Sequence, residues 1–362
     1  MIAVIADDFT GAAELAGISL RYGLSVSVHL NNVIDGDTDT DVLIISTNSR
    51  SMQKAAAVYC TADAVEAIMK YEPSFLYKKI DSVLRGYVID EIKVQMQLNE
   101  KGKAFILPAN PSLHRTIRNG EYFINEKKIT ETAFISDPEF PISNAGVTSM
   151  LQDETVQVVK HDDWLPVEGI VVVETESTAD VAAWAETIDE SWMLAGAGDF
   201  YTALLEKKYK SRPQQKIDLQ SPHLYVCGTA FEGRRQFIKS LSCKAYMPRI
   251  VTEEWLQQAG NIIKHQGKAV IAIDESKESA LVLRTSMAKA VAAIVARENI
   301  KEIFIEGGST AATVLEELNI KKLTPVNELS RGVVRMKAGE LFVTVKPGSY
   351  QLPNEIIELY SS

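Results

Sequence analysis

The sequence has 362 residues, of which 46% are hydrophobic and 24% charged, and its formal net charge is −10. This length suits two domains that each bury a core, and the acidic balance argues against a nucleic-acid partner held by a basic surface. The cysteines are far apart and the histidines lack metal-ligand spacing, so neither a disulfide framework nor a zinc site follows from them. Since neither a signal peptide nor a membrane-spanning apolar run is recognisable, we expect a cytoplasmic protein.

The first half of the chain alternates between short apolar strands and helices, which is typical of a doubly wound α/β domain. Strands are predicted at residues 1–6, 24–30, 41–46, 75–77, 104–107, 156–159 and 169–173. Helices are predicted up to Gly23 and at residues 55–69, 90–99, 179–188 and 200–207. A small hairpin is expected between residues 120 and 129, with Asn125 and Glu126 near its turn.

Polar side chains follow several of these strands. They are Asp7 and Asp8, Arg50, the run of Lys78, Lys79, Asp81, Ser82 and Arg85, and the exit from residue 108 to Arg115. Ligands of open α/β sheets bind outside the carboxyl ends of the strands, so these groups predict a site for a small anion. The alternatives are helix capping for one of the two aspartates and a solvated loop with weak ion pairs for the charged run.

The second half restarts the alternation after a polar segment at residues 208–216, which we interpret as a linker. Strands are predicted at residues 223–227, 269–273 and 302–305, helices at 234–241, from 280 onward and at 311–318, and antiparallel strands at 333–336 and 341–345. The expected domains are residues 1–210 and 211–362. We therefore predict a two-domain α/β protein in which each domain is a mainly parallel sheet flanked by helices.

A glycine-rich turn between a strand and a helix is a candidate phosphate site. It consists of Gly307, Gly308, Ser309 and Thr310, with Gly228-Thr229 and Gly348-Ser349 as companions. Glycines permit close backbone approach and the helix start offers N–H donors, although such turns also occur for steric reasons alone. An anion site in one domain and a nucleotide site in the other, facing a cleft between the domains, suit phosphoryl transfer.

Several stretches resemble, in order along the chain, the motifs of the four-carbon acid sugar kinase family. They are residues 5–12, 79–86, 108–120, 137–138, 307–310 and 346–350. The family consists of ATP-dependent kinases of D-threonate, D-erythronate and 3-oxo-tetronate. The resemblance implies an N-terminal sugar-acid domain, a C-terminal nucleotide domain, and transfer from ATP with Mg²⁺ to the 4-hydroxyl of the sugar acid.

The resemblance also implies site residues. Around the sugar acid it places Asp8, Arg50, Lys79, Asp81, Ser82 and Arg85, to which we add Lys78, and near ATP it places Thr229, Gly307, Gly308, Ser309, Thr310 and Gly348. Arg85 or Arg50 would bind the substrate carboxylate bidentately. Lys78 or Lys79 would neutralise the transferred phosphoryl group, and Asp8 or Asp81 would accept the hydroxyl proton. No metal ligand is assigned.

The sequence departs from the family pattern at Val83, Tyr87, His114, Thr229, Glu14 and residues 347–351. These departures keep two alternatives open. One is a non-catalytic sugar-acid-binding or sensor protein on the kinase scaffold, and the other is a kinase of a different small hydroxy acid. No nucleic acid or membrane partner is expected, and the oligomeric state stays open, with a homodimer as one option.

Overall fold

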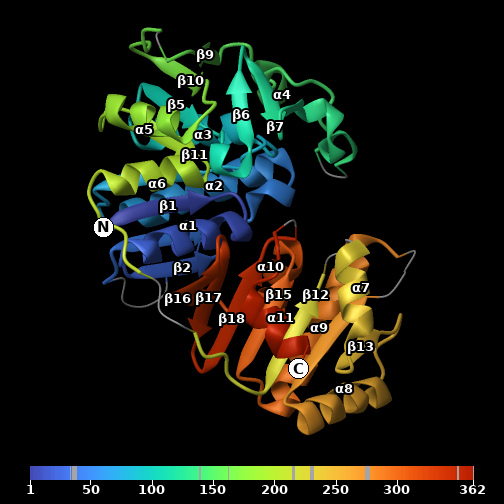
Figure 1. Cartoon of the computed structure of the whole chain (residues 1–362). Helices are drawn as coiled ribbons and strands as arrows, with labels where there is room; N and C mark the ends of the chain where they lie inside the picture. The colour runs from blue at the N-terminus through green and yellow to red at the C-terminus, as the bar shows by residue number, and fades with distance from the viewer. Residues whose placement is uncertain are drawn as a thin grey trace. The chain divides into compact units, whose positions relative to one another are not determined.

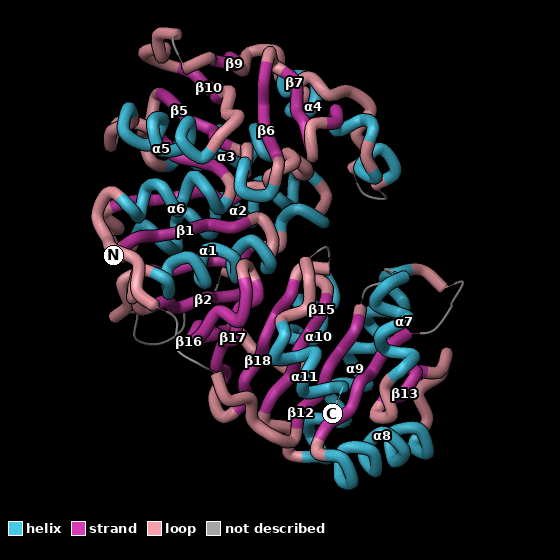
Figure 2. Tube along the Cα trace, in the orientation of Figure 1, coloured by secondary structure: helices cyan, strands magenta, loops and turns pink. Residues whose placement is uncertain are grey.

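The computed structural model describes residues 1–32, 34, 39–137, 140–161, 163–213, 217–228, 232–273, 278–348 and 350–361. The chain divides into two compact units, Met1–Arg212 and Pro213–Ser362, which we call the N-terminal unit and the C-terminal unit. In Figure 1 the C-terminal unit carries the yellow to red part of the colour scale. Figure 2 shows helices beside the strands of a sheet in each unit, which confirms the predicted α/β class.

The N-terminal unit is built on a sheet whose neighbouring strands all run parallel. In spatial order the strands are β2 (Val26–Leu30), β3 (Val42–Ser46), β1 (Ile2–Ala6), β4 (Phe75–Lys79), β11 (Met193–Gly196), β5 (Lys103–Leu107), β10 (Gly169–Val173) and β9 (Gln157–Val159). The central strands are buried along their whole length because helices cover both faces, so they read as continuous apolar runs. β11 was not predicted, since its sequence Met-Leu-Ala-Gly is short and lacks β-branched residues.

Helices cover both faces of this sheet. α1 (Phe9–Arg21), α5 (Thr178–Thr187) and α6 (Gly198–Glu206) pack together on one face, and α2 (Lys54–Met69) packs with α3 (Val88–Leu98) on the other. Short helical segments complete the unit: η1 (Ser49–Ser51), η2 (Pro111–Leu113), η3 (Ile129–Glu131), η4 (Ala133–Ser136) and α4 (Val147–Leu151). All parallel strands therefore present their carboxyl ends at one edge, between these two layers.

A second, antiparallel sheet of the N-terminal unit contains the predicted hairpin. Its strands are β6 (Arg115–Arg118), β7 (Glu121–Ile124) and β8 (Lys127–Lys128). Asn125 and Glu126 form the turn with positive φ angles of 49° and 63°, as a two-residue hairpin turn requires, which confirms their predicted place.

The C-terminal unit has a mixed sheet. In spatial order its strands are β13 (Lys244–Met247), β14 (Lys268–Ile273), β12 (His223–Cys227), β15 (Glu302–Glu306), β18 (Leu341–Lys346), β17 (Val333–Ala338) and β16 (Lys322–Ser330). The pairs up to β18 are parallel, whereas β17 runs antiparallel to β18 and β16, as predicted for the end of the chain. β13 and β16 were not predicted.

Helices α8 (Glu253–Gln266), α9 (Ala280–Glu298) and α10 (Gly308–Glu317) pack in series along the C-terminal unit. α7 (Glu232–Ser240) and α11 (Asn354–Ser361) cover an aromatic core that includes Tyr225, Phe304 and Tyr360. β12, β15 and β18 are neighbouring parallel strands of this sheet. The residues that directly follow them in the chain are Gly228, Gly307 and Pro347.

Candidate active site

Arg50 links the carboxyl ends of β1 and β4. It lies in η1, directly after β3, and its Nε and Nη2 atoms donate to the two carboxylate oxygens of Asp7, each at 2.9 Å. Nη2 also lies 3.1 Å from Asp8 Oδ1, and Nη1 lies 3.7 Å from Asp81 Oδ1. Two consecutive aspartates after β1 and a third after β4, more than seventy positions further along the chain, therefore surround one guanidinium group.

Asp8 begins helix α1. Its Oδ1 atom accepts a hydrogen bond from the Gly11 N–H at 2.9 Å, and the Thr10 hydroxyl donates to Oδ2. A Cβ atom on Gly11 would lie 2.7 Å from Asp8 Oδ1 and 3.1 Å from Lys79 Nζ, so a larger residue there would displace the Asp8 and Lys79 side chains. Burial raises the pKa of Asp8, but the charges of Arg50 and Lys79 outweigh it and hold the pKa below its usual value. Asp8 is thus an ionised helix cap inside the cluster.

Consecutive lysines at the end of β4 point to opposite faces of the sheet, since side chains alternate along a strand. Lys79, which pairs in register with Ala6, has its Nζ atom 3.5 Å from Glu14 of α1 and donates to the Ile80 carbonyl at 2.9 Å. Lys78 is fully buried on the other face, in an ion pair with Glu91 of α3. The structure therefore brings Lys79 to the cluster and separates Lys78 from it.

A tight turn after β4 folds Arg85 back onto Asp81. The Leu84 N–H donates to the Asp81 carbonyl at 3.0 Å, and Leu84 has a φ of 62°, which is rare for a branched side chain. Arg85 donates from Nε to Asp81 Oδ2 at 2.7 Å, and from Nη1 to Asp137 at 2.9 Å. Burial raises the pKa of Asp81, but Arg50 and Arg85 hold it well below the usual range.

Arg115 and Tyr122 of the small sheet reach the same cluster. Arg115 donates to the Ser82 hydroxyl, and the Tyr122 hydroxyl donates to the Ser82 carbonyl at 2.5 Å. Arg115 was among the strand-end groups that predicted the anion site, whereas no site role was predicted for Tyr122 or Asp137. Arg115 and Asp137 lie inside stretches that carry the family resemblance, whereas nothing local in the sequence marks Tyr122.

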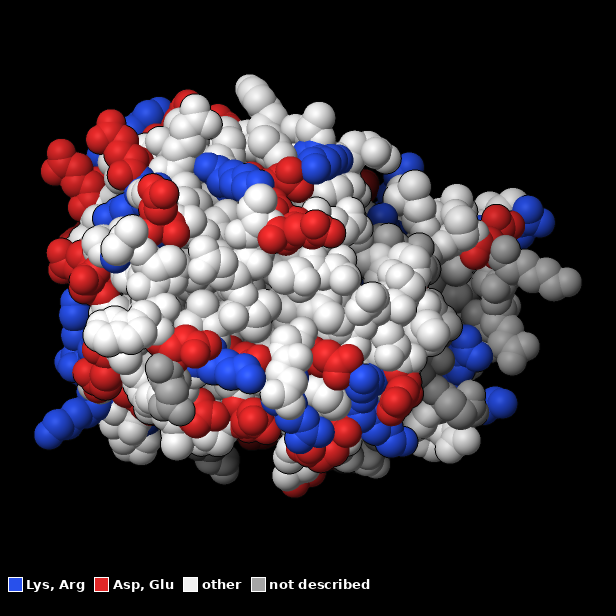
Figure 3. Space-filling model, turned by 90° about the horizontal axis from the view of Figure 1, so that it is seen from above, with Lys and Arg blue, Asp and Glu red and all other residues white. Residues whose placement is uncertain are grey.

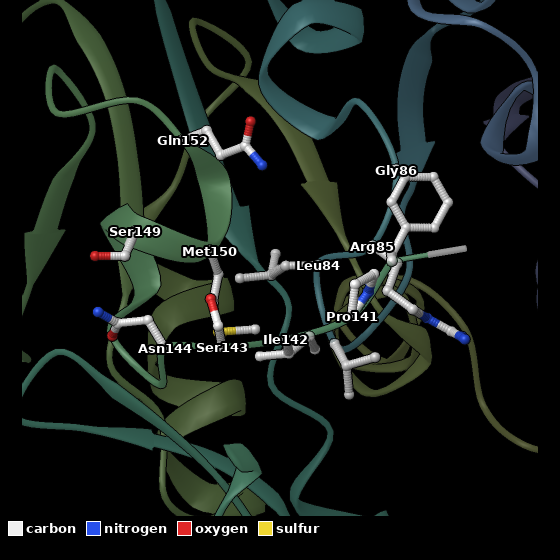
Figure 4. A pocket seen from close by; sticks show the side chains of 12 residues that line it. Leu84, Arg85, Gly86, Pro141, Ile142, Ser143, Asn144, Ser149, Met150 and Gln152 are labelled. Carbon is white, nitrogen blue, oxygen red and sulfur yellow. The ribbon is translucent and has the colours of Figure 1, made fainter. Parts of the chain in front are cut away.

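A cavity of about 300 Å³ adjoins the turn that holds Arg85. Its lining combines apolar side chains with hydroxyl, amide and guanidinium groups. The lining residues are Val83, Leu84, Arg85, Gly86, Phe140, Pro141, Ile142, Ser143, Asn144, Ser149, Met150 and Gln152. In Figure 4 the side chain of Arg85 lies across the cavity from Asn144 and Ser149. The volume is at the lower end of the range for small-molecule sites, about 300–1,000 Å³.

Loops converge at the carboxyl ends of β12, β15 and β18 in the C-terminal unit. The Gly307 N–H donates to the Lys346 carbonyl at 2.9 Å, and the Gly228 N–H donates to the Glu306 carbonyl at 3.0 Å. A Cβ atom on Gly228 would lie 2.0 Å from the Thr310 hydroxyl oxygen, so the first turn of α10 packs directly on the β12 exit. The predicted residues Gly307, Gly308, Ser309, Thr310 and Gly348 thus lie close together, while Thr229 and Ser349 are outside the described residues.

A charged network at this edge was not predicted. Glu306, the last residue of β15, lies 2.8 Å from Arg234 Nε and 2.9 Å from Lys346 Nζ, and it accepts a hydrogen bond from the Tyr225 hydroxyl. Burial and the negative charges near the ring raise the pKa of Tyr225 well above its usual value. Lys346 lies inside a stretch that carries the family resemblance and Glu306 directly precedes another, whereas nothing local in the sequence marks Tyr225 or Arg234.

Within the described residues, no group of three or more histidine, cysteine, aspartate or glutamate side chains has the arrangement of a metal site. In the same part of the chain, no helix has the length and apolar character that crossing a membrane requires. The described cysteines Cys60, Cys227 and Cys243 are free thiols in this structure. Figure 3 shows a face on which positive and negative side chains are interspersed around a central area with few charges.

Comparison with known proteins finds two family models. Residues 2–204 match the sugar-binding N-terminal domain and residues 248–350 match the nucleotide-binding C-terminal domain. The D-threonate kinase of Salmonella typhimurium is 28% identical over 313 residues, which cover 78% of this chain and 71% of that protein. The D-threonate kinase of Bordetella bronchiseptica is 28% identical, but only 49% of its length is matched.

Shorter matches include a 3-oxo-tetronate kinase of Brucella melitensis, 29% identical, and a D-erythronate kinase of Heliobacterium modesticaldum, 27% identical. They cover 36% and 35% of those proteins and 42% and 41% of this chain. Among solved structures, a Salmonella typhimurium protein matches 99% of this chain and 98% of its own with a TM-score of 0.83 at 16% identity. A Haemophilus influenzae protein matches 99% of both chains with a TM-score of 0.79 at 17% identity. These structural matches show the fold.

Proposed function

The chain belongs to the four-carbon acid sugar kinase family, which makes it a phosphotransferase with an alcohol acceptor, and we propose that it uses ATP to phosphorylate the terminal hydroxyl of a four-carbon sugar acid. The proposed substrates are D-threonate, D-erythronate and 3-oxo-tetronate, because relatives named for each match this chain. The observation that carries the proposal is the cluster of Asp8, Arg50, Lys79, Asp81 and Arg85 within the region that matches the sugar-binding model.

Arg85 is our candidate for binding the substrate carboxylate. It lines the cavity of about 300 Å³, and its side chain is 25% exposed, compared with 14% for Arg50. Both arginines bind an aspartate through Nε and Nη2, Arg50 with Asp7 and Arg85 with Asp81, so the choice between them rests on exposure and on the place of Arg85 in the cavity lining. We propose that Arg50 holds Asp7 and Asp8 in place. An arginine matches the planar geometry of a carboxylate, which a lysine does not.

Asp8 is our candidate for accepting the proton of the terminal hydroxyl. Its side chain is 19% exposed, whereas that of Asp81 is 8% exposed and both of its oxygens accept hydrogen bonds from Arg85. A carboxylate with a lowered pKa can serve this step, since positioning and charge neutralisation carry most of phosphoryl transfer. Asp81 then positions Arg85, and Lys79, which lies near Asp8, neutralises charge on the transferred group.

ATP is proposed to bind at the start of α10, where Gly308, Ser309 and Thr310 offer N–H groups and the positive end of a helix dipole, with Gly307 as the N-cap and Gly348 beside them. Thr229 is proposed from the resemblance alone. Glu306 does not fit a Mg²⁺ ligand, because Arg234 and Lys346 occupy its oxygens. We therefore propose that the phosphates of ATP hold Mg²⁺, which supplies charge neutralisation there.

The test is a screen of the purified protein by thermal shift and ADP release, with Mg-ATP and D-threonate, D-erythronate, 3-oxo-tetronate, their L-isomers and D-glycerate. A ligand that binds the native state raises its stability, so binding without turnover is also detected. ADP release with one four-carbon acid would support the proposal and name the substrate. Stabilisation by a sugar acid without any effect of ATP would overturn it in favour of a sensor, and turnover of D-glycerate alone in favour of a kinase for another hydroxy acid.

A further inference from the structure

The network of Arg234, Glu306 and Lys346 contains more positive than negative charge. Among the described residues, Glu306 is the carboxylate that both cations contact, at 2.8 Å and 2.9 Å, and Glu306 and Lys346 are fully buried. One carboxylate balances one cation. A second buried cation is costly unless another anion lies close to it.

The direction of the Lys346 pKa agrees with this imbalance. Burial lowers the pKa of Lys346 from its usual value, although the charge of Glu306 opposes the change. A buried lysine with enough anions around it would not show a lowered pKa. The charges of the network therefore favour the binding of one further anion, which would balance its second cation.

Arg234 is the member that has hydrogen-bonding capacity left. The Lys346 ammonium group has three N–H donors, and it contacts Glu306, the Pro347 carbonyl at 2.6 Å and the Gly348 carbonyl at 3.3 Å. Arg234 uses Nε for Glu306, and within the described residues its Nη1 and Nη2 atoms have no hydrogen-bond partner. Its side chain is 15% exposed, so it is largely buried and still accessible from one side.

A second feature beside Arg234 also favours an anion. Glu306 is followed directly by Gly307, the N-cap residue of α10, and that helix has 10 residues. The first N–H groups of a helix have no partner within the helix, and they carry partial positive charge. The guanidinium fork and the helix start therefore attract an anion at the same edge of the sheet.

We propose that Arg234 binds a phosphate of the nucleotide beyond the α-phosphate, and that Glu306 and Lys346 are positioning residues for this contact. Glu306 holds Arg234 through Nε, which leaves the Nη1 and Nη2 pair for a bidentate contact with phosphate oxygens. Lys346 holds the Pro347 and Gly348 carbonyls, and so fixes the loop that follows β18. The inference rests on the proposed nucleotide site and adds a residue to it.

The test compares Arg234→Ala and Arg234→Lys with Arg235→Ala, which removes the neighbouring arginine of the same helix. Dissociation constants of ATP, AMP and inorganic tripolyphosphate are measured by calorimetry on the full chain. A lost hydrogen bond to a charged group predicts that Arg234→Ala weakens ATP and tripolyphosphate binding about tenfold to a hundredfold. AMP binding is expected to stay unchanged, and Arg235→Ala is expected to behave as the wild type.

Wild-type ATP affinity in Arg234→Ala, or equal losses for ATP and AMP, would overturn the inference. Equal losses in Arg235→Ala would also overturn it, because they would indicate general electrostatic attraction. If Arg234→Ala does not fold, Arg234→Lys decides: it keeps the charge beside Glu306 and lacks the fork, so an unchanged ATP affinity contradicts the bidentate contact. Tripolyphosphate binding through Arg234 in a protein that phosphorylates no sugar acid would disprove the proposed function and leave this inference standing.

Discussion

Each unit has a network of charged side chains at the carboxyl ends of its parallel strands, and the two networks differ in the sign of the charge that is in excess. In the N-terminal unit Arg50 contacts Asp7, Asp8 and Asp81, so carboxylates surround a cation. In the C-terminal unit Glu306 lies between Arg234 and Lys346, so cations surround a carboxylate. The parallel sheet determines where a ligand binds, and the side chains at the strand ends determine which ligand.

The difference matches the two tasks of a kinase. A site that takes a proton from a hydroxyl group needs an ionised carboxylate held in one orientation, and Arg50 and Lys79 keep Asp8 ionised. A site for a polyphosphate needs cations and N–H donors, which Arg234 and the start of α10 supply. Variants in each unit test whether this division between the units holds.

The largest effect is expected from Asp8→Asn, which removes the proposed proton acceptor. The kcat for the sugar acid should fall by about 10²–10⁴, while its KM changes little, since Arg85 is untouched. Asp90→Asn, which breaks the exposed ion pair of Asp90 with Lys54, is the matched control and should keep the wild-type kcat. A wild-type kcat in Asp8→Asn, together with a lost kcat in Asp81→Asn at unchanged KM, would assign the role to Asp81.

Variants of the buried ion pair between Lys78 and Glu91 test whether activity depends only on the cluster around Arg50 or also on Lys78. Lys78→Met leaves Glu91 buried without its partner, which should lower the free energy of unfolding by about 3–5 kcal/mol. Adding Glu91→Leu should restore most of that stability, because neither charge is then buried. Urea unfolding measures both variants.

Turnover of the double variant decides the role of Lys78. We expect wild-type kcat and KM, since Lys78 points away from Asp8 and Lys79. A double variant that is stable but inactive would support the hypothesis, drawn from the sequence, that Lys78 belongs to the active site.

Arg85→Lys sharpens the assignment of the substrate carboxylate. Because a lysine cannot make the bidentate contact, the KM for the sugar acid should rise about tenfold to a hundredfold, whereas the KM for ATP should not change. Arg118→Lys, at a partly exposed arginine paired with Glu126, serves as the control. If instead the KM for ATP rises, Arg85 acts on the phosphoryl donor.

The smallest expected effect is a loss of stability of the C-terminal unit as the pH falls. Burial, followed by the charges of Arg335 and Lys268, lowers the pKa of His223 from 6.5 to about 3. Between these values the unfolded chain binds more protons, so stability is complete above about pH 6.5 and falls by about 1.4 kcal/mol per pH unit on acidification. Amide exchange of β12 at pH 7, 6 and 5 measures this loss, which His223→Gln should abolish. An unchanged pH slope in that variant would place the sensitivity elsewhere.

Local patterns in the sequence determined much of this protein. The apolar runs with polar ends predicted the parallel strands β1, β3, β4, β12 and β15, because a strand buried on both faces is continuously hydrophobic. The same reading predicted that Asp8 and Asp81 follow strands and that Gly307 precedes a helix, whereas Lys79, predicted to follow a strand, is the last residue of β4. These features depend on neighbouring residues, so one stretch of sequence contains the information.

The tertiary structure decided the rest. Which of Lys78 and Lys79 reaches the cluster depends on whether α1 or α3 covers that face of β4, and this follows from the strand order. In the network of Arg234, Glu306 and Lys346, the glutamate contacts an arginine 72 positions before it and a lysine in a different strand. Such contacts form only when the sheet brings distant strand ends together, and burial then determines which charges need a partner.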